Sequence, residues 1–439
     1  MKTYQSKYTG TEIDQAIGQV SVNTNEINLL ESFLGFPYQG EGIYGTIADF
    51  ENRTFERWGQ TETTLTQCQA LQGRKRCNLS DAGVVNAYYG DAGYIEDGSN
   101  GQVMVEQPKF YYRVVPLKLD KQTDGIGYHL RKALYLISDN YFEGSKVHPR
   151  FLLPNGSEID KVYLSAYEAC IYDTSAGSYI TDDAQIADFA TDKLSSIVNV
   201  KPCSGLTQNL TRSNIQLMAN NRGNGWMSDD IKTESMNQLL MIIELNMFNT
   251  QVGIGRGVVD FPSGTGNESV NTGQTSSLGN QTGQATGIGG QVSVTYRGME
   301  NPWGNILKFV YGLNIYGDGT QKGGIPYYCT DFDYKESVHD GNYKSAEFTI
   351  SNASGYISAF GYSEYCDWMF IPSECLGNSN LPVGDYTYVI TDLNGYRLSL
   401  LGGSWSHGSA AGGFSWSLSD GVGGRARVFG GRSLYVPQN

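Results

Sequence analysis

Aromatic, serine and arginine side chains alternate with glycine near the end of the 439-residue sequence. Rigid aromatic rings offer contact area at a low entropy cost, and serine hydroxyls add adaptable hydrogen bonds. Rings also stack on sugars, and arginine pairs with acidic groups. This segment therefore predicts a ligand-binding surface, whose candidate residues are Ser406, His407, Ser409, Phe414, Ser415, Trp416, Ser417, Arg425, Arg427 and Phe429.

The glycines around these residues bear on which side chains face solvent. Glycine-rich flanks make poor core strands, so we expect Phe414 and Trp416 to point outward, with a core position as the alternative. Alternation along a strand would place Arg425 and Arg427 on one face. For these two arginines a solvated rim is the alternative to ligand contact.

Catalytic and metal-binding patterns are incomplete in the sequence. His407 with the nearby serines and Asp420 could suggest a Ser-His-Asp hydrolase, but no G-x-S-x-G turn and no following helix accompany them. Asp331, Asp333 and Asp340 could ligate calcium, but their spacing matches no EF-hand loop, which favours solvated turn carboxylates. We therefore expect no catalytic residue, metal ligand or cofactor, and a protein that is not an enzyme.

Charge and cysteine content disfavour several classes of protein. The 31 Lys and Arg residues against 45 Asp and Glu residues give a net charge of −14, which disfavours nucleic acid as a partner. We find no apolar segment of a signal peptide and no apolar run of about 18 residues, so we expect no membrane insertion. The seven cysteines lack CxxC spacing, which favours buried, reduced thiols in a protein made in a cytosol.

The clearest predicted helix spans residues 11–34 and has a narrow apolar seam. Its apolar residues recur at heptad spacing, as in a coiled coil, and β-branched residues at both seam positions favour three strands. An ordinary amphipathic helix packed on its own chain is the alternative. We therefore predict a homotrimeric stem built on Ile13, Ile17, Val20, Ile27 and Leu34.

The remainder of the chain predicts short strands, a few helices and long glycine-rich loops, which together make an α+β fold. Residues 263–291, rich in Gly, Ser and Thr, predict a long surface loop that is functional or mobile. We expect an N-terminal coiled-coil stem at 1–36, a connecting region at 37–100 and a head at 101–439. Strands are predicted at 103–114, 135–141 and 161–172, and helices at 47–58, 182–198, 214–221 and 229–248, the last capped by Ser228.

Three stretches of the sequence have a distinctive order and spacing. They are Tyr296–Gly312 with its Glu300-Asn301-Pro302-Trp303-Gly304-Asn305, then Gly402-Gly403-Ser404-Trp405, and finally Gly430-Gly431-Arg432-Ser433-Leu434. Together they resemble the C-type-lectin folds of the formylglycine-generating-enzyme type, over roughly residues 100–436, which implies a C-type-lectin-like head at 101–439. The segments Tyr163–Glu168 and Gly225-Trp226 fit the same scaffold, which also implies a core position for Trp405.

Cysteine positions separate the two branches of that family. The enzyme branch holds copper with a cysteine pair near its C-terminus, whereas this sequence has no cysteine after Cys375. The non-catalytic branch matches better, and it includes phage receptor-binding proteins and tropism determinants diversified by retroelements. The segment Tyr8–Asp14 also looks like the start of phage tail-fibre chains.

The resemblance implies a function in host attachment. It implies a homotrimeric virion protein of the tail or capsid surface, made in the host cytoplasm and joined to other virion proteins through its N-terminus. This protein would bind a bacterial surface glycan or protein through its C-terminal lectin-like face. A capsid head-fibre or decoration protein with a structural role and no required ligand is the alternative.

Overall fold

Strands make up most of the regular structure. The computed structural model describes residues 42–58, 62–180, 187–205, 209–262, 264, 267–380 and 383–438. Within these ranges, only helices α6 (Arg212–Asn220) and α7 (Ile231–Leu245) are longer than four residues, against strands β1 to β27. The predicted α+β class is therefore wrong, and the described part begins with a strand and not with a long helix. The predicted stem residues Ile13, Ile17, Val20, Ile27 and Leu34 lie outside the described residues.

The first sheet gathers strands from both halves of the chain. Its path is β2-β1-β7-β21-β22, and β6 pairs with β7 and with β8. The predicted helix at 47–58 is wrong, because these residues form the β1–β2 hairpin, whose turn is held by the Asn52 amide donating to Asp49 Oδ1 at 2.9 Å. The strands are β1 (Ile43–Asp49), β2 (Thr54–Trp58), β6 (Tyr111–Lys121), β7 (Tyr128–Ser138), β8 (Lys146–Val147), β21 (Ala359–Tyr362) and β22 (Pro372–Glu374).

The second sheet has six strands and pairs early strands of the described chain with its last one. Its order is β13-β27-β9-β5-β3-β4, so that the last strand of the chain lies between two earlier ones. The strands predicted near 103–114 and 161–172 are confirmed in β5 and β6, and in β9 and β10. The strands are β3 (Lys75–Leu79), β4 (Val85–Tyr88), β5 (Gln102–Pro108), β9 (Lys161–Ser165), β13 (Trp226–Ser228) and β27 (Ser433–Tyr435).

The third sheet carries the segment that the sequence analysis singled out for binding. Its path is β19-β18-β17-β24-β25-β23-β20, with β26 parallel to β17. The strands are β17 (Leu307–Asp318), β18 (Ile325–Cys329), β19 (Tyr343–Ser345), β20 (Gly355–Tyr356), β23 (Tyr386–Tyr388), β24 (Asn394–Leu401), β25 (Trp416–Ser417) and β26 (Phe429–Gly430).

Two small sheets and several single turns complete the fold. The predicted helix at 182–198 is wrong where it is described, because Lys193–Ser195 is strand β12. The sheets consist of β10 (Cys170–Asp173), β11 (Ser178–Ile180) and β12, and of β14 (Gly283–Gln284), β15 (Val294–Tyr296) and β16 (Met299–Glu300). The turns are α3 (Glu62–Leu65), α4 (Gln69–Gln72), α8 (Thr250–Gly253), η1 (Pro149–Phe151), η2 (Ser276–Leu278) and η3 (Gly408–Ala410).

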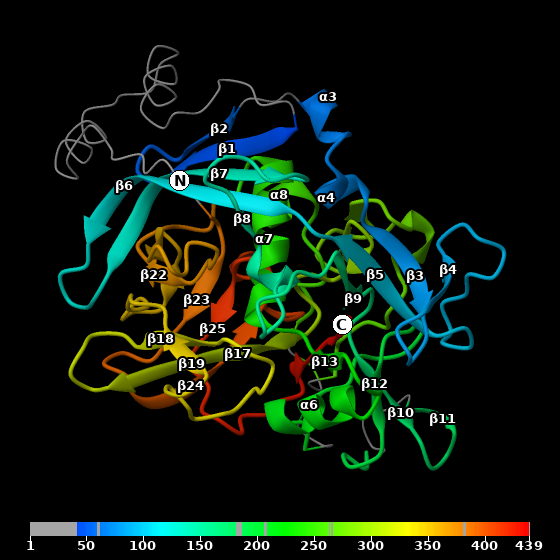
Figure 1. Cartoon of the computed structure of the whole chain (residues 1–439). Coiled ribbons are helices and arrows are strands. Elements are labelled where there is room, and N and C mark those ends of the chain that lie inside the picture. Colours follow the sequence, from blue (N-terminus) through cyan, green and yellow to red (C-terminus); the bar gives the residue numbers. More distant parts are fainter. Residues whose placement is uncertain are drawn as a thin grey trace.

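Helix α7 runs through the middle of the molecule, between the first sheet and β17 (Figure 1). All its residues from Ile231 to Ile243 are buried, including polar ones. Asp230, and not the predicted Ser228, caps its first turn by accepting from the Thr233 amide at 2.8 Å. The same carboxylate pairs with Arg150 Nη1 at 2.6 Å, so the buried cap is charge-balanced. The helices predicted at 214–221 and 229–248 are thus confirmed as α6 and α7.

A buried charged cluster lies where the segments of the family resemblance meet. Glu168, at the end of Tyr163–Glu168, accepts from the side-chain amides of Asn301 at 3.2 Å and Asn305 at 2.5 Å. Its other oxygen lies 3.1 Å from Lys308 Nζ, and both side chains are essentially inaccessible to solvent. Burial lowers the pKa of Lys308 to about 8 while Glu168 opposes that shift. Arg432 joins this cluster by donating to the carbonyls of Ser165 at 3.1 Å and Asn301 at 2.9 Å.

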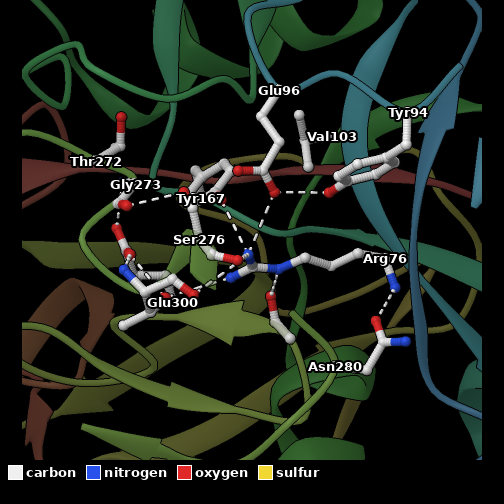
Figure 2. Close-up of polar contacts among 12 residues, drawn as sticks. Arg76, Tyr94, Glu96, Val103, Tyr167, Thr272, Gly273, Ser276, Asn280 and Glu300 are labelled. Atoms are coloured by element: carbon white, nitrogen blue, oxygen red, sulfur yellow. Dashed lines mark hydrogen bonds and ion pairs between the residues drawn. The ribbon is translucent and has the colours of Figure 1, made fainter. Parts of the chain in front are cut away.

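The glycine-rich segment predicted as a surface loop is anchored to a second buried cluster (Figure 2). Glu300 accepts from the Gly273 amide at 2.8 Å and from the Thr275 amide and hydroxyl, both at 2.7 Å. Arg76 donates to Thr275 Oγ1 at 3.2 Å and to the Tyr167 hydroxyl at 3.0 Å. Thr275 is fully buried, so this part of the predicted loop belongs to the interior.

We expect the Lys308→Met variant to be strongly destabilised. The substitution keeps the side-chain volume but leaves the Glu168 carboxylate buried without its cation, which costs about 3–5 kcal/mol. Urea unfolding of the purified protein measures this loss. The double variant Glu168→Gln/Lys308→Met should recover part of it, because no buried charge is left unpaired.

Lys335→Met is the matched control for Lys308→Met. Lys335 pairs with Asp333 at 2.7 Å, but both side chains are more than half exposed, so the change should cost far less stability than Lys308→Met. Equal stability of the two lysine variants would contradict the structural role assigned to the Glu168 cluster.

Candidate functional site

A glycine-shaped turn between β24 and β25 presents part of the predicted binding segment to solvent. Gly403 has a φ of +75°, and a Cβ atom there would lie 2.7 Å from the Ala411 Cβ, so only glycine permits this close approach. His407 Nδ1 accepts from the Ser404 amide at 2.8 Å, which orients the imidazole ring. Ser406 and Ser409 are exposed and His407 is half-buried, as the sequence analysis predicted for a surface segment.

A neighbouring helical turn holds the same loop from outside. Gln251 of α8 donates through Nε2 to the carbonyls of Gly408 at 2.9 Å and Ala411 at 2.7 Å. The Gly408 amide donates in turn to the Val259 carbonyl at 2.9 Å. The backbone of the loop is therefore held on both sides.

Three half-buried tyrosines extend this surface, and none of them is among the ligand-binding residues predicted from the sequence. Tyr356 and Tyr386 pair across β20 and β23, with ring centroids 5.1 Å apart and an interplanar angle of 87°. The Tyr386 ring lies 4.7 Å from that of Tyr388, which lies 5.5 Å from the His407 ring. The Tyr356 hydroxyl is 3.2 Å from Ser409 Oγ. We name Tyr356, Tyr386, Tyr388, Ser406, His407 and Ser409 the tyrosine–histidine face.

The tyrosine–histidine face carries no formal charge at neutral pH. Burial lowers the pKa of His407 below its usual value, so the ring is neutral, and its Nε2 carries the proton because Nδ1 accepts. Burial raises the pKa of Tyr388, and the adjacent Tyr386 and Tyr356 raise it further. The face therefore offers aromatic rings, hydroxyls and one imidazole N–H, a set suited to an uncharged or hydroxyl-rich ligand.

The outward orientation predicted for Phe414 and Trp416 is wrong. Both side chains are fully buried, and Trp416 Nε1 donates to the Phe370 carbonyl at 3.0 Å. Phe414 packs against Phe248 at a centroid distance of 5.1 Å. The surrounding glycines let the backbone pass close to other segments and bring the rings inward: a Cβ on Gly413 would lie 3.1 Å from Met241 Cε.

Three further predicted ligand contacts are also buried. Ser415 Oγ donates to the Tyr386 carbonyl at 3.0 Å, and Ser417 Oγ donates to Asp420 Oδ2 at 3.1 Å. Phe429 packs against Phe309 with their ring centroids 5.9 Å apart. Their side chains thus contact other residues of the protein. Trp405, for which the resemblance implied a core position, is buried as expected.

Arg425 and Arg427 lie in the irregular segment just before β26, and not in a strand. Ala426, between them, accepts from the Gly205 amide at 2.8 Å, so both arginines are placed beside residue 205. Arg425 is exposed and Arg427 is half-buried. The alternation predicted from a strand is therefore wrong for this pair.

The cysteines have the character that the sequence predicted. All seven are free, six of them are buried, and Cys375 is partly exposed. Burial raises the pKa of Cys68 to about 12, which keeps its thiol protonated. Across the described ranges, no group of three or more His, Cys, Asp or Glu side chains is arranged to hold a metal ion. No helix in the part of the chain that the structure describes has both the length and the apolar character needed to cross a membrane.

Comparisons with known proteins give a distant structural likeness. No protein-family model matches the sequence, and no curated protein matches it. Among solved structures, the chain is similar to the Major Tropism Determinant P3c Variant and to the Major Tropism Determinant U1 Variant, with TM-scores of 0.27 and 0.28. Each alignment has 10% sequence identity and covers 91% of this chain and 73% of that chain. Such TM-scores assign neither fold nor function, and the C-type-lectin fold stays a prediction.

We expect the Trp416→Ala variant to lose about 3–5 kcal/mol of unfolding free energy, because a fully buried indole leaves a cavity when it is removed. Chemical denaturation followed by circular dichroism measures the loss. Tyr141→Ala is the control, since Tyr141 is 66% exposed and its truncation should change stability by about 0.5 kcal/mol or less. A Trp416→Ala protein as stable as this control would place the indole at the surface after all.

Proposed function

We propose that this chain is a bacteriophage virion protein that attaches to a glycan or protein of the host surface through the tyrosine–histidine face. The observation that carries the proposal is the gathering of four aromatic rings, contacting one another in sequence, beside the exposed serines of the 406–409 turn. The proposed activity is binding without turnover.

The geometry of the rings favours binding because little freedom remains to be lost. Tyr356, Tyr386, Tyr388 and His407 contact one another in sequence, and the Tyr356 hydroxyl contacts Ser409. Surfaces whose aromatic side chains are already ordered lose less conformational entropy on binding. Exposed hydroxyls beside such rings supply hydrogen bonds that suit sugars and peptide groups alike.

The sequence resemblance supports a virion setting for this binding face. The residues Glu300, Asn305 and Arg432 belong to the segments that resemble the C-type-lectin folds of the formylglycine-generating-enzyme type, and the lack of a cysteine after Cys375 favours the non-catalytic branch that includes phage receptor-binding proteins. In this chain the same residues are buried and polar-bonded, as residues that support a scaffold would be. The tyrosine–histidine face lies on strands and turns attached to that scaffold.

We expect the Ser406→Arg substitution to reduce attachment at least tenfold. Ser406 is exposed and precedes His407, so a long charged side chain there would hinder the approach of a ligand to the face. A loss of about 1.4 kcal/mol in binding free energy already lowers affinity tenfold. The measurement is the fraction of virions carrying the variant that adsorb to host cells in a fixed time. Tyr388→Ala, which removes a ring without adding charge, should act in the same direction.

Ser178→Arg is the matched control for Ser406→Arg. Ser178 is also exposed, but it lies in β11, in a different sheet. We expect wild-type adsorption for this variant and unchanged melting temperatures for both serine variants. Normal adsorption of both Ser406→Arg and Tyr388→Ala would refute the attachment face and favour the alternative of a structural head-fibre or decoration protein.

A further inference from the structure

A second aromatic surface lies in a cleft beside β8, away from the tyrosine–histidine face. The cleft has a volume of about 450 Å³ and is bordered by β8, η1 and residues 364–368. Ligand sites in proteins have volumes of about 300–1,000 Å³, so the cleft has room for one or two sugar rings. Neither Tyr356, Tyr386 and Tyr388 nor the 406–409 turn lines it.

Aromatic rings form both the floor and the rim of this cleft. Trp368 is 3% exposed and is supported from behind by Tyr328, with ring centroids 5.6 Å apart at 89°. Tyr112 is held by its hydroxyl, which donates to Asp367 Oδ1 at 2.6 Å. Tyr365, by contrast, is 62% exposed although it is a large aromatic side chain. A rigid floor beneath an exposed ring is an arrangement that can receive the apolar face of a sugar.

Charged groups around the rings supply both hydrogen-bond donors and hydrogen-bond acceptors. Lys146 Nζ lies 2.9 Å from Asp367 Oδ2, so its charge is already balanced within the protein. Glu158 and Glu364 are exposed at the cleft and add carboxylate acceptors, of which Glu158 lies 3.1 Å from Lys109 Nζ. Hydroxyl groups can donate to these carboxylates. Of the charged residues that line the cleft, Lys146 and Glu158 are ion-paired, so the carboxylate of Glu364 is left to repel an anionic ligand.

We propose that this cleft binds a pyranose oligosaccharide that carries no acidic group. The exposed ring of Tyr365 would contact the C–H face of a sugar above the floor that the buried Trp368 supports, and Glu158, Glu364 and Lys146 would bond its hydroxyls. The inference stands apart from the proposed attachment function, because the two surfaces share no residue and each can be altered alone.

Calorimetric titration of the full-length protein with four trisaccharides tests the cleft. The probes are maltotriose, mannotriose and chitotriose, which are uncharged, and trigalacturonate, which is acidic. We expect at least one uncharged trisaccharide to bind and trigalacturonate to bind at least tenfold more weakly. Tyr365→Ala should weaken the uncharged trisaccharide at least tenfold, because it removes the exposed ring.

Two control variants make the result specific to the cleft. Tyr141→Ala removes a tyrosine of similar exposure, 66%, that does not line the cleft, and it should bind like the wild type. Ser178→Arg, at an exposed residue of β11 that belongs to neither surface, should also leave trisaccharide binding unchanged. Calorimetry tests the cleft and virion adsorption tests the attachment face, so a failure of one proposal is distinguishable from a failure of the other. Binding of none of the uncharged probes, equal binding by Tyr365→Ala with an unchanged melting temperature, or equal binding of trigalacturonate would overturn the proposal.

Discussion

The burial of the Glu168 carboxylate is the constraint around which the fold is organised. A carboxylate withdrawn from water is tolerated only when cations and hydrogen-bond donors surround it. Here Lys308 comes from β17 and the two asparagines from the turn before it, while Arg432 braces the same turn from the end of the chain. Asn301 and Asn305 adopt left-handed backbone conformations, with φ of +48° and +59°, so the turn is shaped to aim its amides at the carboxylate.

The residues beneath the tyrosine–histidine face determine its shape without touching a ligand. Strand β25 runs parallel to β23, where Trp416 pairs with Thr387 and Ser417 with Tyr388. The buried indole therefore sits directly beside the strand that carries Tyr386 and Tyr388. The segment 404–417 contributes to the face in two ways: its turn presents hydroxyls, and its strand supports rings that belong to another part of the sequence.

How far the sequence predicts this structure depends on whether a segment is governed by local or by distant contacts. The periodic apolar residues of α7 and the alternation in β5 and β9 predict those elements, because the pattern follows the period of the element itself. The helix predicted at 47–58 is wrong because the short apolar pattern of the β1–β2 hairpin fits the period of a helix as well as that of a strand. The sequence predicts the candidate site only in part. Ser406, His407 and Ser409 are at the surface as predicted. Phe414 and Trp416 are buried because they contact Phe248 and Phe370, which are far away in the sequence. The signal for the missing rings was present in Tyr386-Thr387-Tyr388, where alternation places both tyrosines on one face of a strand.

The position of β27 has a consequence for the order in which the chain can fold. This strand lies between β9 and β13, and Arg432 beside it bonds to Ser165, 267 residues earlier. On the ribosome, β9 and β13 emerge long before the strand that joins them, and each waits with an open hydrogen-bonding edge. Pairing across such a sequence separation is slow, and the second sheet keeps this gap until residues 433–435 have been made. A chain truncated shortly before residue 433 would keep that gap permanently, and its open strand edges would favour aggregation.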